Sequence, residues 1–588
     1  MILLRFQPVS GAPVANRLWA WPRVEARPQT VPPTRGALPA LLCALLLFPL
    51  LVRAQFTNGF VASAHPLATQ AGLAALKAGG NAIDAAVAVG LTLGVVDGHN
   101  SGIGGGCFLL IRRANGEVIA LDGREMAPMA ATRDMFIRNG QADVQLSQTG
   151  PLASGVPGSV AVYEHAVKQF GRRSFADALR PGMTIAEQGF PITGIYANRL
   201  KASADDLAKF PGSRAVLFRE GRPWQKGEVL RQPDLAATYR ALAEQGSGWF
   251  YRGPFAESVA RWMRDHGGLL TAADFARYEF KLREPIRTRY RGHEIVSFPP
   301  PSSGGVHVAQ MLNILEHFDL RGMDEAPRRH VVAEAMKLAF ADRAHWLGDP
   351  DFVKVPRGLV ATNYAAELAR RIQVDKAIRV AGYGTPPHAG EDVFGDRHTT
   401  HFSVADAEGN WVACTATVNT GFGSKVIVPG TGVILNNQMD DFSVQPGVAN
   451  YFGLVGAEAN AIAPGKRPLS SMSPTIVLKD GQPIMAIGAA GGPRIITAVL
   501  QCLIGLLDMK QTPAEALAAP RLHQQWSPNE LMVEKSLPSG LREALAARGH
   551  VPKIVTDGSS VHVVTRPMNA PGFAGAADPR GDGTAAGW

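Results

Sequence analysis

The chain has 588 residues, of which 46% are hydrophobic and 19% are charged. This composition is typical of a folded globular protein and excludes a mainly disordered chain. The net charge is +9, but lysine and arginine are scattered along the chain and form no basic run interleaved with aromatic residues, so nucleic-acid binding is not supported. The length fits several domains or one large α/β body.

Residues 1–54 differ in composition from the rest of the chain. A Pro-rich lead containing arginines precedes the apolar run LPALLCALLLFPLLV at 38–52, which Arg53 and Ala54 follow. A basic lead, a short apolar run and a small residue at the cut are typical of a secretory signal, and the run is short for a membrane span. We predict a signal peptide or an uncleaved N-terminal anchor at 1–54, and an exported protein that is periplasmic or secreted. The lead is long, so the true start can also lie downstream of Met1.

Cleavage at Ala54 would leave three of the four cysteines, Cys107, Cys414 and Cys502. Three cysteines do not make a disulfide framework in so large an exported protein. We expect them to be buried as small apolar side chains.

Two helices and a glycine-rich loop are predicted after the leader. Residues 67–78 have helical apolar spacing and stop at Gly79-Gly80, a typical C-terminal cap. Asn81 then opens the helix AIDAAVAVGLTLGVV. The loop SGIGGGCFLLI at 101–111 is not a dinucleotide fingerprint, since the third glycine of that pattern would fall on Cys107. We expect its glycines to let the backbone pass close to another wall or to a substrate.

Arg124 follows the predicted strand 118–122, within the turn GREMAP. An arginine in such a turn can be an ordinary surface residue. The functional alternative is a bidentate clamp on a carboxylate, which the planar guanidinium favours. The residues alone leave both interpretations open.

The middle of the chain, about 160–390, is predicted to be largely helical. The loop FPPPSSGG at 298–305 interrupts it, and Ser303 is expected to cap the helix that follows. The amphipathic stretches lie at 160–170, 233–245, 254–266, 305–318 and 329–346.

A predicted hairpin follows an exposed linker. The linker, 374–396, is rich in glycine and proline and leads through Arg397 and His398 to Thr399, and a loosely held loop is where a chain is most easily cut. A strand at 399–404 then passes through a polar turn into a second strand at 411–418.

The Thr-Thr pair at the head of this hairpin has two interpretations. If the chain were cut before Thr399, that residue would carry a hydroxyl nucleophile and a free α-amine that serves as its general base. The alternative is that Thr399 and Thr400 are ordinary strand residues. His398 and His401 have no further candidate ligands nearby, so no metal site is expected there.

A strand is predicted at 483–496, with Gly491 and Gly492 at a strand-to-helix turn. Backbone N–H groups at such a turn can hold an oxyanion, although a plain tight turn is the simpler explanation for a Gly-Gly pair taken alone. The tail is predicted to finish with helices at 513–519 and near 538–547, and with strands around 551–565.

From about Gly59 to its end, the chain closely resembles the γ-glutamyltransferase (γ-glutamyl transpeptidase) family through many motifs in order. These motifs are GGNAIDAAVAVG at 79–90, GGG at 104–106, DGREMAP at 122–128, PPPSSGG at 299–305, GDPDFVKVP at 348–356, TTHFSV at 399–404, GVILNNQMDDFS at 432–443, KRPLSSMSPTIV at 466–477 and GGPRIIT at 491–497.

The resemblance implies an α+β fold, the four-layer αββα sandwich of the N-terminal nucleophile hydrolases. It also implies an inactive precursor that cuts itself between His398 and Thr399. The products would be a large subunit, 55–398, and a small catalytic subunit, 399–588, which associate as a heterodimer.

The resemblance also implies a role for individual residues. Thr399 matches the nucleophile, Thr417 the threonine that hydrogen-bonds it, and Gly491 and Gly492 the oxyanion hole. The residues that match the γ-glutamyl site are Arg124, Ser470 and Ser471 for the α-carboxylate, and Asp441 with Asn419 and Gln438 for the α-ammonium.

The activity implied is transfer or hydrolysis of the γ-glutamyl group of glutathione and related compounds. Water or an acceptor amino acid or peptide would resolve the acyl-enzyme, with no metal or organic cofactor. One departure concerns the flexible lid of the family, where Phe452, beside Tyr451, stands in the place of a tyrosine that could bond Asn419. The balance of hydrolysis over transfer therefore stays open, as do the physiological donor and acceptor.

Two other interpretations are kept. A related acylase of the glutaryl or cephalosporin type could use the same scaffold, but a glutaryl group has no ammonium for Asp441 to bind. A non-enzymatic relative would be expected to lose Thr399 or the oxyanion glycines, and the sequence retains all three.

Overall fold

The computed structural model describes residues 56–390, 393–394, 402–556, 558–567 and 571–588. These residues belong to one compact unit, Ala54–Trp588. The predicted leader 1–54 and the residues His398, Thr399 and His401 lie outside the described residues.

A seven-stranded antiparallel sheet has the order β10-β3-β2-β14-β13-β1-β22. Neighbours in this sheet come from distant parts of the chain, because β14 pairs with β2 as well as with its hairpin partner β13. Its strands are β1 (Gly59–Ser63), β2 (Gly106–Arg112), β3 (Val118–Gly123), β10 (Lys281–Arg283), β13 (Ser403–Asp406), β14 (Trp411–Thr417) and β22 (Thr584–Gly587).

A six-stranded antiparallel sheet, in the order β11-β12-β15-β16-β20-β21, faces the first one. The hydroxyl of Ser403 on β13 donates across the gap to the carbonyl of Ala486 on β16 at 3.0 Å. The strands are β11 (Ile286–Tyr290), β12 (His293–Ser297), β15 (Thr475–Lys479), β16 (Gln482–Ala490), β20 (Ser560–Thr565) and β21 (Ala574–Ala577).

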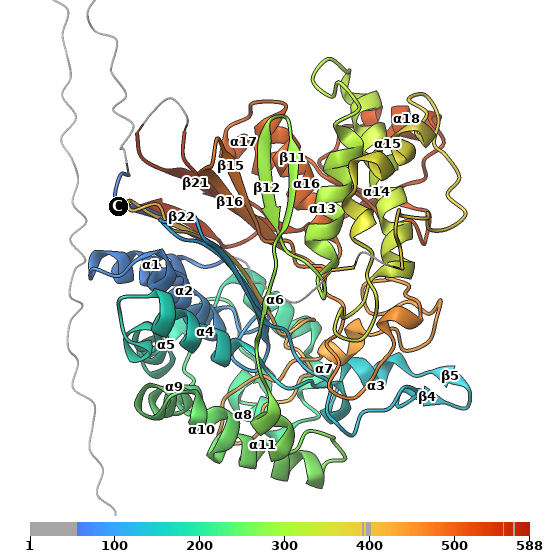
Figure 1. The fold of residues 1–588 in the computed structure, drawn as a ribbon. Coiled ribbons are helices and arrows are strands. Elements are labelled where there is room, and N and C mark those ends of the chain that lie inside the picture. Colours follow the sequence, from blue (N-terminus) through green and yellow to red (C-terminus); the bar gives the residue numbers. More distant parts are fainter. Residues whose placement is uncertain (1–55, 391–392, 395–401, 557, 568–570) are drawn as a thin grey trace, which may run out of the picture. The chain divides into compact units, whose positions relative to one another are not determined.

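Helices cover the outer face of each sheet, so the described chain is an α+β protein (Figure 1). Against the seven-stranded sheet lie α1 (Pro66–Lys77), α2 (Ala82–Val96) and α4 (Ser159–Phe170), and α5 (Phe175–Gln188) packs on α2. Against the six-stranded sheet lie α13 (Ser303–Leu315) and α16 (Arg494–Leu507), and α14 (Glu325–Trp346) packs on α13.

Shorter elements connect these layers. The other helices are α3 (Val144–Gln148), α6 (Gly194–Ala202), α7 (Ala204–Leu207), α8 (Pro211–Leu217), α9 (Pro233–Gln245), α10 (Ser247–Arg252), α11 (Pro254–Asp265), α12 (Ala272–Arg277), α15 (Thr362–Arg371), α17 (Pro513–Ala518) and α18 (Ser539–Ala547). The small sheets pair β4 (Ile137–Arg138) with β5 (Gln141–Ala142), β6 (Phe190–Pro191) with β9 (Val229–Leu230), β7 (Phe218–Arg219) with β8 (Arg222–Pro223), and β17 (Leu522–Gln524) with β18 (Leu531–Glu534) and β19 (Pro552–Val555).

Alternation along β2 divides the apolar side chains between two cores. Phe108 and Leu110 belong to the core that includes the six-stranded sheet, whereas Cys107, Leu109 and Ile111 belong to the core beneath α1, α2, α4 and α5. Successive side chains of a strand point to opposite faces, so a strand buried on both faces must be apolar throughout. The prediction that Cys107, Cys414 and Cys502 are buried is confirmed.

Several local predictions are confirmed. Asn81 caps α2 through a capping box with Asp84, and Gly79 follows α1 with a positive φ of 86°. The glycine loop does approach another wall, because a Cβ on Gly105 would lie 1.9 Å from the carbonyl oxygen of Thr417.

Three local predictions need correction. The cap of α13 is Ser302, not Ser303, since the Ser302 hydroxyl accepts from the Gly304 N–H at 3.1 Å. The strand predicted at 483–496 ends at Ala490, and the last residues of that run begin α16. The middle region also contains β10 and β11, which are edge strands, and β12, which lies next to β11; none of the three was predicted.

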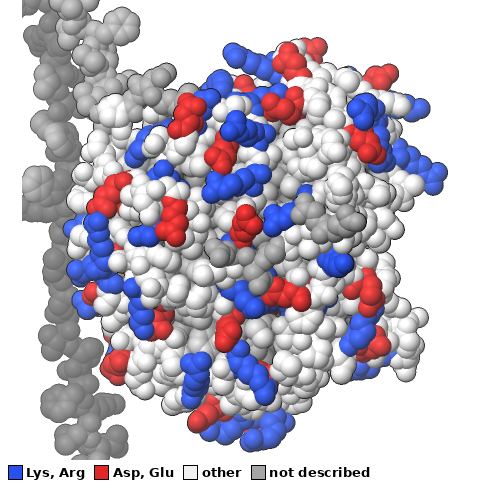
Figure 2. Space-filling model, viewed as in Figure 1, with Lys and Arg blue, Asp and Glu red and all other residues white. Residues whose placement is uncertain are grey.

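The charged side chains on the face shown in Figure 2 are mixed in sign and spread over the surface. This distribution agrees with the scattered arginines and lysines of the sequence. Among the described helices, none is both long and apolar enough to be a candidate membrane span.

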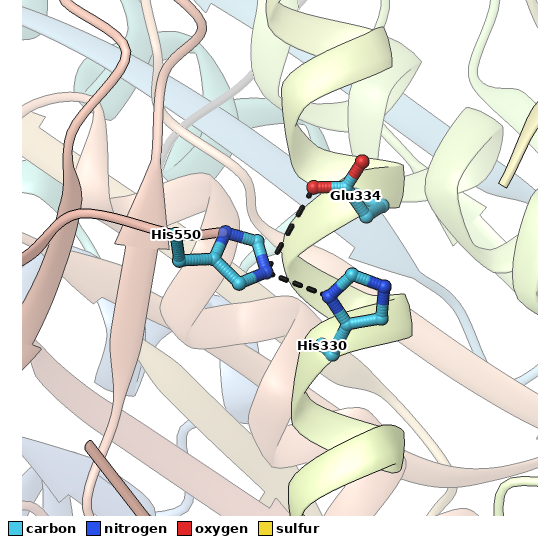
Figure 3. Close-up of side chains that lie close together, drawn as sticks. All are labelled: His330, Glu334 and His550. Atoms are coloured by element: carbon cyan, nitrogen blue, oxygen red, sulfur yellow. Dashed lines mark hydrogen bonds and ion pairs between the residues drawn. The ribbon is translucent and has the colours of Figure 1, made fainter. Parts of the chain in front are cut away.

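A buried polar cluster joins α14 to the segment after α18 (Figure 3). His330 Nδ1 lies 2.7 Å from His550 Nε2, and His330 Nε2 lies 2.7 Å from the carbonyl oxygen of Gln373. Because a carbonyl only accepts, His330 must donate from Nε2, and its Nδ1 then accepts from His550. Glu334, one turn along α14, accepts from Lys337 at 2.6 Å.

Burial lowers the pKa of His550 to about 3 and lowers the pKa of His330. Both imidazoles are therefore neutral near pH 7, as the hydrogen-bond pattern requires. The unfolded chain protonates its histidines near pH 6.5, so this cluster makes stability fall as the pH drops from about 6.5 towards 3.

We predict that His550→Gln makes the protein less acid-sensitive than the wild type. Glutamine can still donate to His330 but does not titrate, and one such histidine costs about 1.4 kcal/mol of stability per pH unit within that window. The measurement is the difference in Tm between pH 7 and pH 5. His317→Gln, at an exposed position, is the control and should match the wild type; an equal Tm loss in His550→Gln and wild type would contradict the prediction.

Candidate active site

A cavity of about 410 Å³ opens beside the ends of β14 and β16. Every predicted site residue that the structure describes lines it, although these residues come from distant parts of the sequence. They are Arg124, Thr417, Asn419, Gln438, Asp441, Ser470, Ser471, Gly491 and Gly492. Thr399 lies outside the described residues.

Arg124 and Asp441 form an ion pair at one end of the cavity. Arg124 directly follows β3 and is 1% exposed, and its Nη2 donates to Asp441 Oδ2 at 2.5 Å. Its Nε also donates to the carbonyl oxygen of Pro468 at 3.0 Å. Burial raises the pKa of Asp441, while the neighbouring Arg124 opposes this shift. The two charges therefore neutralise each other when no ligand separates them.

Gln438 completes the surroundings of this guanidinium. With its amide oxygen directed at Arg124, it accepts from Nη1 at 3.1 Å and donates to the carbonyl oxygen of Val418 at 3.2 Å. Amide orientation is assigned from such partners. Glu125, also buried, has an oxygen 3.6 Å from Arg124 Nη1. Burial raises the pKa of Glu125 to about 8, so this carboxyl is mostly uncharged at pH 7 and leaves the Arg124 charge to Asp441.

Thr417 and Asn419 lie at the end of β14. The Thr417 hydroxyl accepts from the Asn419 N–H at 2.7 Å, and Asn419 Nδ2 donates to the carbonyl oxygen of Asn437 at 3.0 Å. Asn419 has a positive φ of 81°, a conformation that non-glycine residues adopt seldom and that is often found at functional sites. This backbone turn directs its side chain along the cavity wall.

The hairpin partner of β14 leads towards the same place. Phe402 accepts from the Cys414 N–H at 2.5 Å, and Ser403 pairs with Ala413. The strands are antiparallel, so following the chain back from Ser403 leads along β14 in the direction of Thr417.

Ser470 and Ser471 lie next to the ion pair. The Ser470 carbonyl accepts from the Ser303 hydroxyl at 2.7 Å, which fixes this segment to the start of α13. The Ser471 hydroxyl accepts from Arg343 Nη2 at 3.2 Å. Because that bond uses a lone pair, the hydroxyl proton of Ser471 stays available for an anionic ligand.

Gly491 and Gly492 form the turn between β16 and α16. Their φ angles are +135° and +59°, which favour glycine. A Cβ on Gly492 would lie 2.6 Å from Phe452 Cδ1, so the Phe452 ring rests directly on this turn. Gly491, Gly492 and Arg494 at the start of α16 line the cavity, and the N-terminal end of a helix attracts negative charge.

Three arginines at this cavity were not predicted. Arg343 on α14 is buried, and burial lowers its pKa to about 10, while Asp441 opposes that shift. Its Nε donates to the Ser303 hydroxyl at 2.9 Å. Arg199 and Arg494 line the cavity itself, whereas Arg343 reaches its wall through the bond to Ser471. Arg343 could have been noticed in the sequence, because it is an arginine on the apolar face of the helix predicted at 329–346.

The group of described residues best placed to hold a metal ion is His330, Glu334 and His550. Two histidine nitrogens on one tetrahedral zinc lie about 3.3 Å apart for bonds of about 2.05 Å, wider than the 2.7 Å found here. The ammonium of Lys337 also already occupies Glu334. The hydrogen-bonded interpretation given above therefore accounts for this cluster.

Comparison with known proteins identifies the relatives of this chain. The sequence profile of the family described as Gamma-glutamyltranspeptidase matches residues 68–588. The chain is 45% identical over 535 residues to the glutathione hydrolase proenzyme of Escherichia coli (strain K12), covering 90% of this chain and 91% of that protein.

Acylases are also similar. The chain is 40% identical over 547 residues to the Acylase ACY 1 proenzyme of Pseudomonas sp. (strain SE83), covering 90% of this chain and 94% of that protein. Among solved structures, the cephalosporin acylase from Bacillus halodurans matches with a TM-score of 0.82 and 31% identity, covering 96% of this chain and 99% of that one. Proteins named as glutathione hydrolases and as acylases both match this chain, so the fold alone does not distinguish the two activities and the residues of the site must do so.

Proposed function

The chain belongs to the γ-glutamyltranspeptidase family, and we propose that this enzyme transfers and hydrolyses γ-glutamyl groups through an acyl-enzyme on Thr399. The donors would be glutathione and related γ-glutamyl compounds. The observation that carries the proposal is the buried pair of Arg124 and Asp441 in one cavity with the Gly491–Gly492 turn.

Processing is part of this proposal. The chain would adopt the αββα sandwich of N-terminal nucleophile hydrolases and cut itself between His398 and Thr399, giving subunits 55–398 and 399–588 that associate as a heterodimer. Two facing sheets with helices on their outer sides support this fold, and the E. coli relative is named a proenzyme. The direction of β13 supports a place for Thr399 beside Thr417.

Recognition would work by charge exchange. A γ-glutamyl group carries an α-carboxylate and an α-ammonium, and it would insert between Arg124 and Asp441. Its carboxylate would face Arg124 and the Ser470 and Ser471 hydroxyls, and its ammonium would face Asp441 with Asn419 and Gln438 as acceptors. Because both charges of the protein are paired before and after binding, neither is left buried alone, which would cost about 3–5 kcal/mol.

The chemical steps follow from this placement. The Thr399 hydroxyl attacks the γ-carbonyl carbon as the α-amine of Thr399 takes its proton. The oxyanion forms against the Gly491 and Gly492 turn. Its collapse breaks the amide bond, and the proton passes to the leaving amine. Water or an acceptor amine then attacks the ester carbonyl carbon and gives a proton to the Thr399 amine. Collapse of this second oxyanion breaks the bond to the Thr399 side-chain oxygen, which takes that proton back, and releases glutamate or the new γ-glutamyl amide.

A related acylase of the glutaryl or cephalosporin type remains the second candidate, because acylases match this chain over most of its length. A glutaryl group carries a carboxylate but no ammonium. Asp441 would therefore find no cationic group on the ligand and would keep only its contact with Arg124. The buried carboxylate therefore favours γ-glutamyl donors.

We also propose that the protein is exported to the periplasm or the medium, with residues 1–54 as a signal or an anchor. The apolar run at 38–52 and the small residue that ends the leader support this.

We predict that Thr399→Ala stays a single chain without turnover, because it removes the hydroxyl needed for both the cut and catalysis. Wild-type protein should show two fragments on a denaturing gel, the smaller beginning at Thr399. Thr399→Ser keeps a hydroxyl and should still be cut and active. An intact wild-type chain that is inert towards γ-glutamyl-p-nitroanilide would refute the proposed function.

We predict that Asp441→Asn lowers kcat/KM for γ-glutamyl-p-nitroanilide by about 10- to 100-fold, the effect of losing one charged hydrogen bond. Glutaryl-p-nitroanilide should be affected far less, because it has no ammonium. Asp375→Asn, at an exposed position, controls for the loss of a negative charge. Equal losses on both donors would show that Asp441 does not bind the ammonium.

A further inference from the structure

A short segment, Asn450–Leu454, covers part of the cavity and is called the cover segment here. Its fold is a closed turn, because Asn450 Oδ1 accepts from the N–H groups of Phe452 and Leu454, each at 3.1 Å. Gly453 has a positive φ of 74°. The turn points Phe452 inward onto Gly492, while Tyr451 is 56% exposed.

Two hydrogen bonds to residues that do not belong to the cover segment hold it in place. On one side, the N–H of Tyr451 donates to Asp440 Oδ2 at 3.0 Å. On the other side, Gln525 Nε2 donates to the carbonyl oxygen of Gly453 at 2.9 Å. Gln525 is 4% exposed and lines the cavity, so its amide is placed between the cover segment and the cavity wall.

The orientation of Gln525 is fixed by a directional chain of hydrogen bonds. Its Oε1 lies 2.9 Å from His523 Nε2, and His523 Nδ1 lies 2.9 Å from the Thr497 hydroxyl on α16. Gly453 O and Gln525 Oε1 only accept, so Gln525 donates from Nε2 and His523 donates from Nε2. His523 Nδ1 then accepts from the Thr497 hydroxyl, which also lies 3.2 Å from the carbonyl oxygen of Arg494. Burial lowers the pKa of His523 to about 4, which keeps this tautomer neutral at working pH.

We propose that Gln525 is a positioning residue that holds Phe452 over Gly492 and thereby keeps the cavity closed around the donor. This inference rests on the proposed function. Phe452 has no hydroxyl with which to hold the cover segment closed, and the hydrogen bond from Gln525 to the Gly453 carbonyl would hold it instead. Gln525 acts through the cover segment and not on the reacting atoms.

The first test is Gln525→Ala in the processed enzyme. Loss of one hydrogen bond should raise the KM for γ-glutamyl-p-nitroanilide by about 2- to 10-fold, while kcat stays within about 2-fold because Thr399, Thr417 and the oxyanion turn are unchanged. The fraction of acyl-enzyme that is transferred to an acceptor dipeptide should fall. A dipeptide must be bound and oriented by the residues that line the cavity before its amine can attack, whereas water need not be. In a Phe452→Ala background, Gln525→Ala should have no further effect on KM.

The sharper test is Gln525→Glu. An ionised glutamate still accepts from His523 but places an oxygen against the Gly453 carbonyl, so the KM should rise near pH 8. A protonated glutamate can donate again, and burial raises its pKa. The KM should therefore recover towards the wild-type value as the pH falls to about 5. Gln482→Glu, exposed at the start of β16, is the matched control and should follow the wild type throughout.

The outcomes separate this inference from the proposed function. An active wild type with a Gln525→Glu variant whose KM matches it at every pH would overturn the role of Gln525 alone. If Gln525→Ala is not cut into two chains, Gln525→Glu decides; if neither is cut, Gln525 is a structural residue and the proposal is wrong. A wild type without γ-glutamyl turnover would instead refute the proposed function.

Discussion

The arrangement of the cavity depends on one buried ion pair, between Arg124 and Asp441. The two residues are 317 positions apart in sequence, yet Nη2 and Oδ2 are 2.5 Å apart. A lone charge at this depth is strongly unfavourable, so the fully buried Arg124 needs the largely buried carboxylate of Asp441 beside it. The pair thus requires the end of β3 and the 3-10 turn Gln438–Asp441 to meet, and the folded chain gains a site with one positive and one negative contact.

A site of this kind suits a ligand that carries both charges. The carboxylate of a zwitterion can replace Asp441 as the partner of Arg124, and its ammonium can replace Arg124 as the partner of Asp441. A simple anion would instead place a second negative charge near Asp441. Ser471 and Arg343 add a donor on the carboxylate side, and the high pKa of Glu125 avoids a competing charge. Under the proposed function, these contacts would favour a γ-glutamyl group over a glutaryl group on the same scaffold.

Close backbone approaches hold the rest of the cavity in place. A Cβ on Gly105 would collide with the carbonyl of Thr417, and a Cβ on Gly492 would collide with Phe452. The first approach fixes the end of β14 that carries Thr417 and Asn419. The second allows an aromatic ring to rest on the proposed oxyanion turn, so the catalytic and covering parts of the cavity meet at one glycine.

The sequence by itself determined the local elements whose causes are local. The capping box at Asn81, the helical spacing of α1 and the turn between β13 and β14 depend on residues a few positions apart. Motif resemblance also named nine residues that the structure brings to one cavity. Short charged strands such as β11 were missed. What makes β11 a strand is its pairing with β12 and its packing against α13, and neither can be inferred from the residues of β11 alone.

Only the tertiary structure decided which distant groups touch. No local pattern indicates that Arg124 meets Asp441, that Arg343 reaches Ser471, or that Gln525 bonds the backbone of Gly453. These contacts join residues that are 72, 128 and 317 positions apart in the sequence. Loop closure over such distances carries little sequence signal. The physical reason is that a buried polar group must find a partner, and the fold, not the neighbouring residues, chooses which partner is within reach.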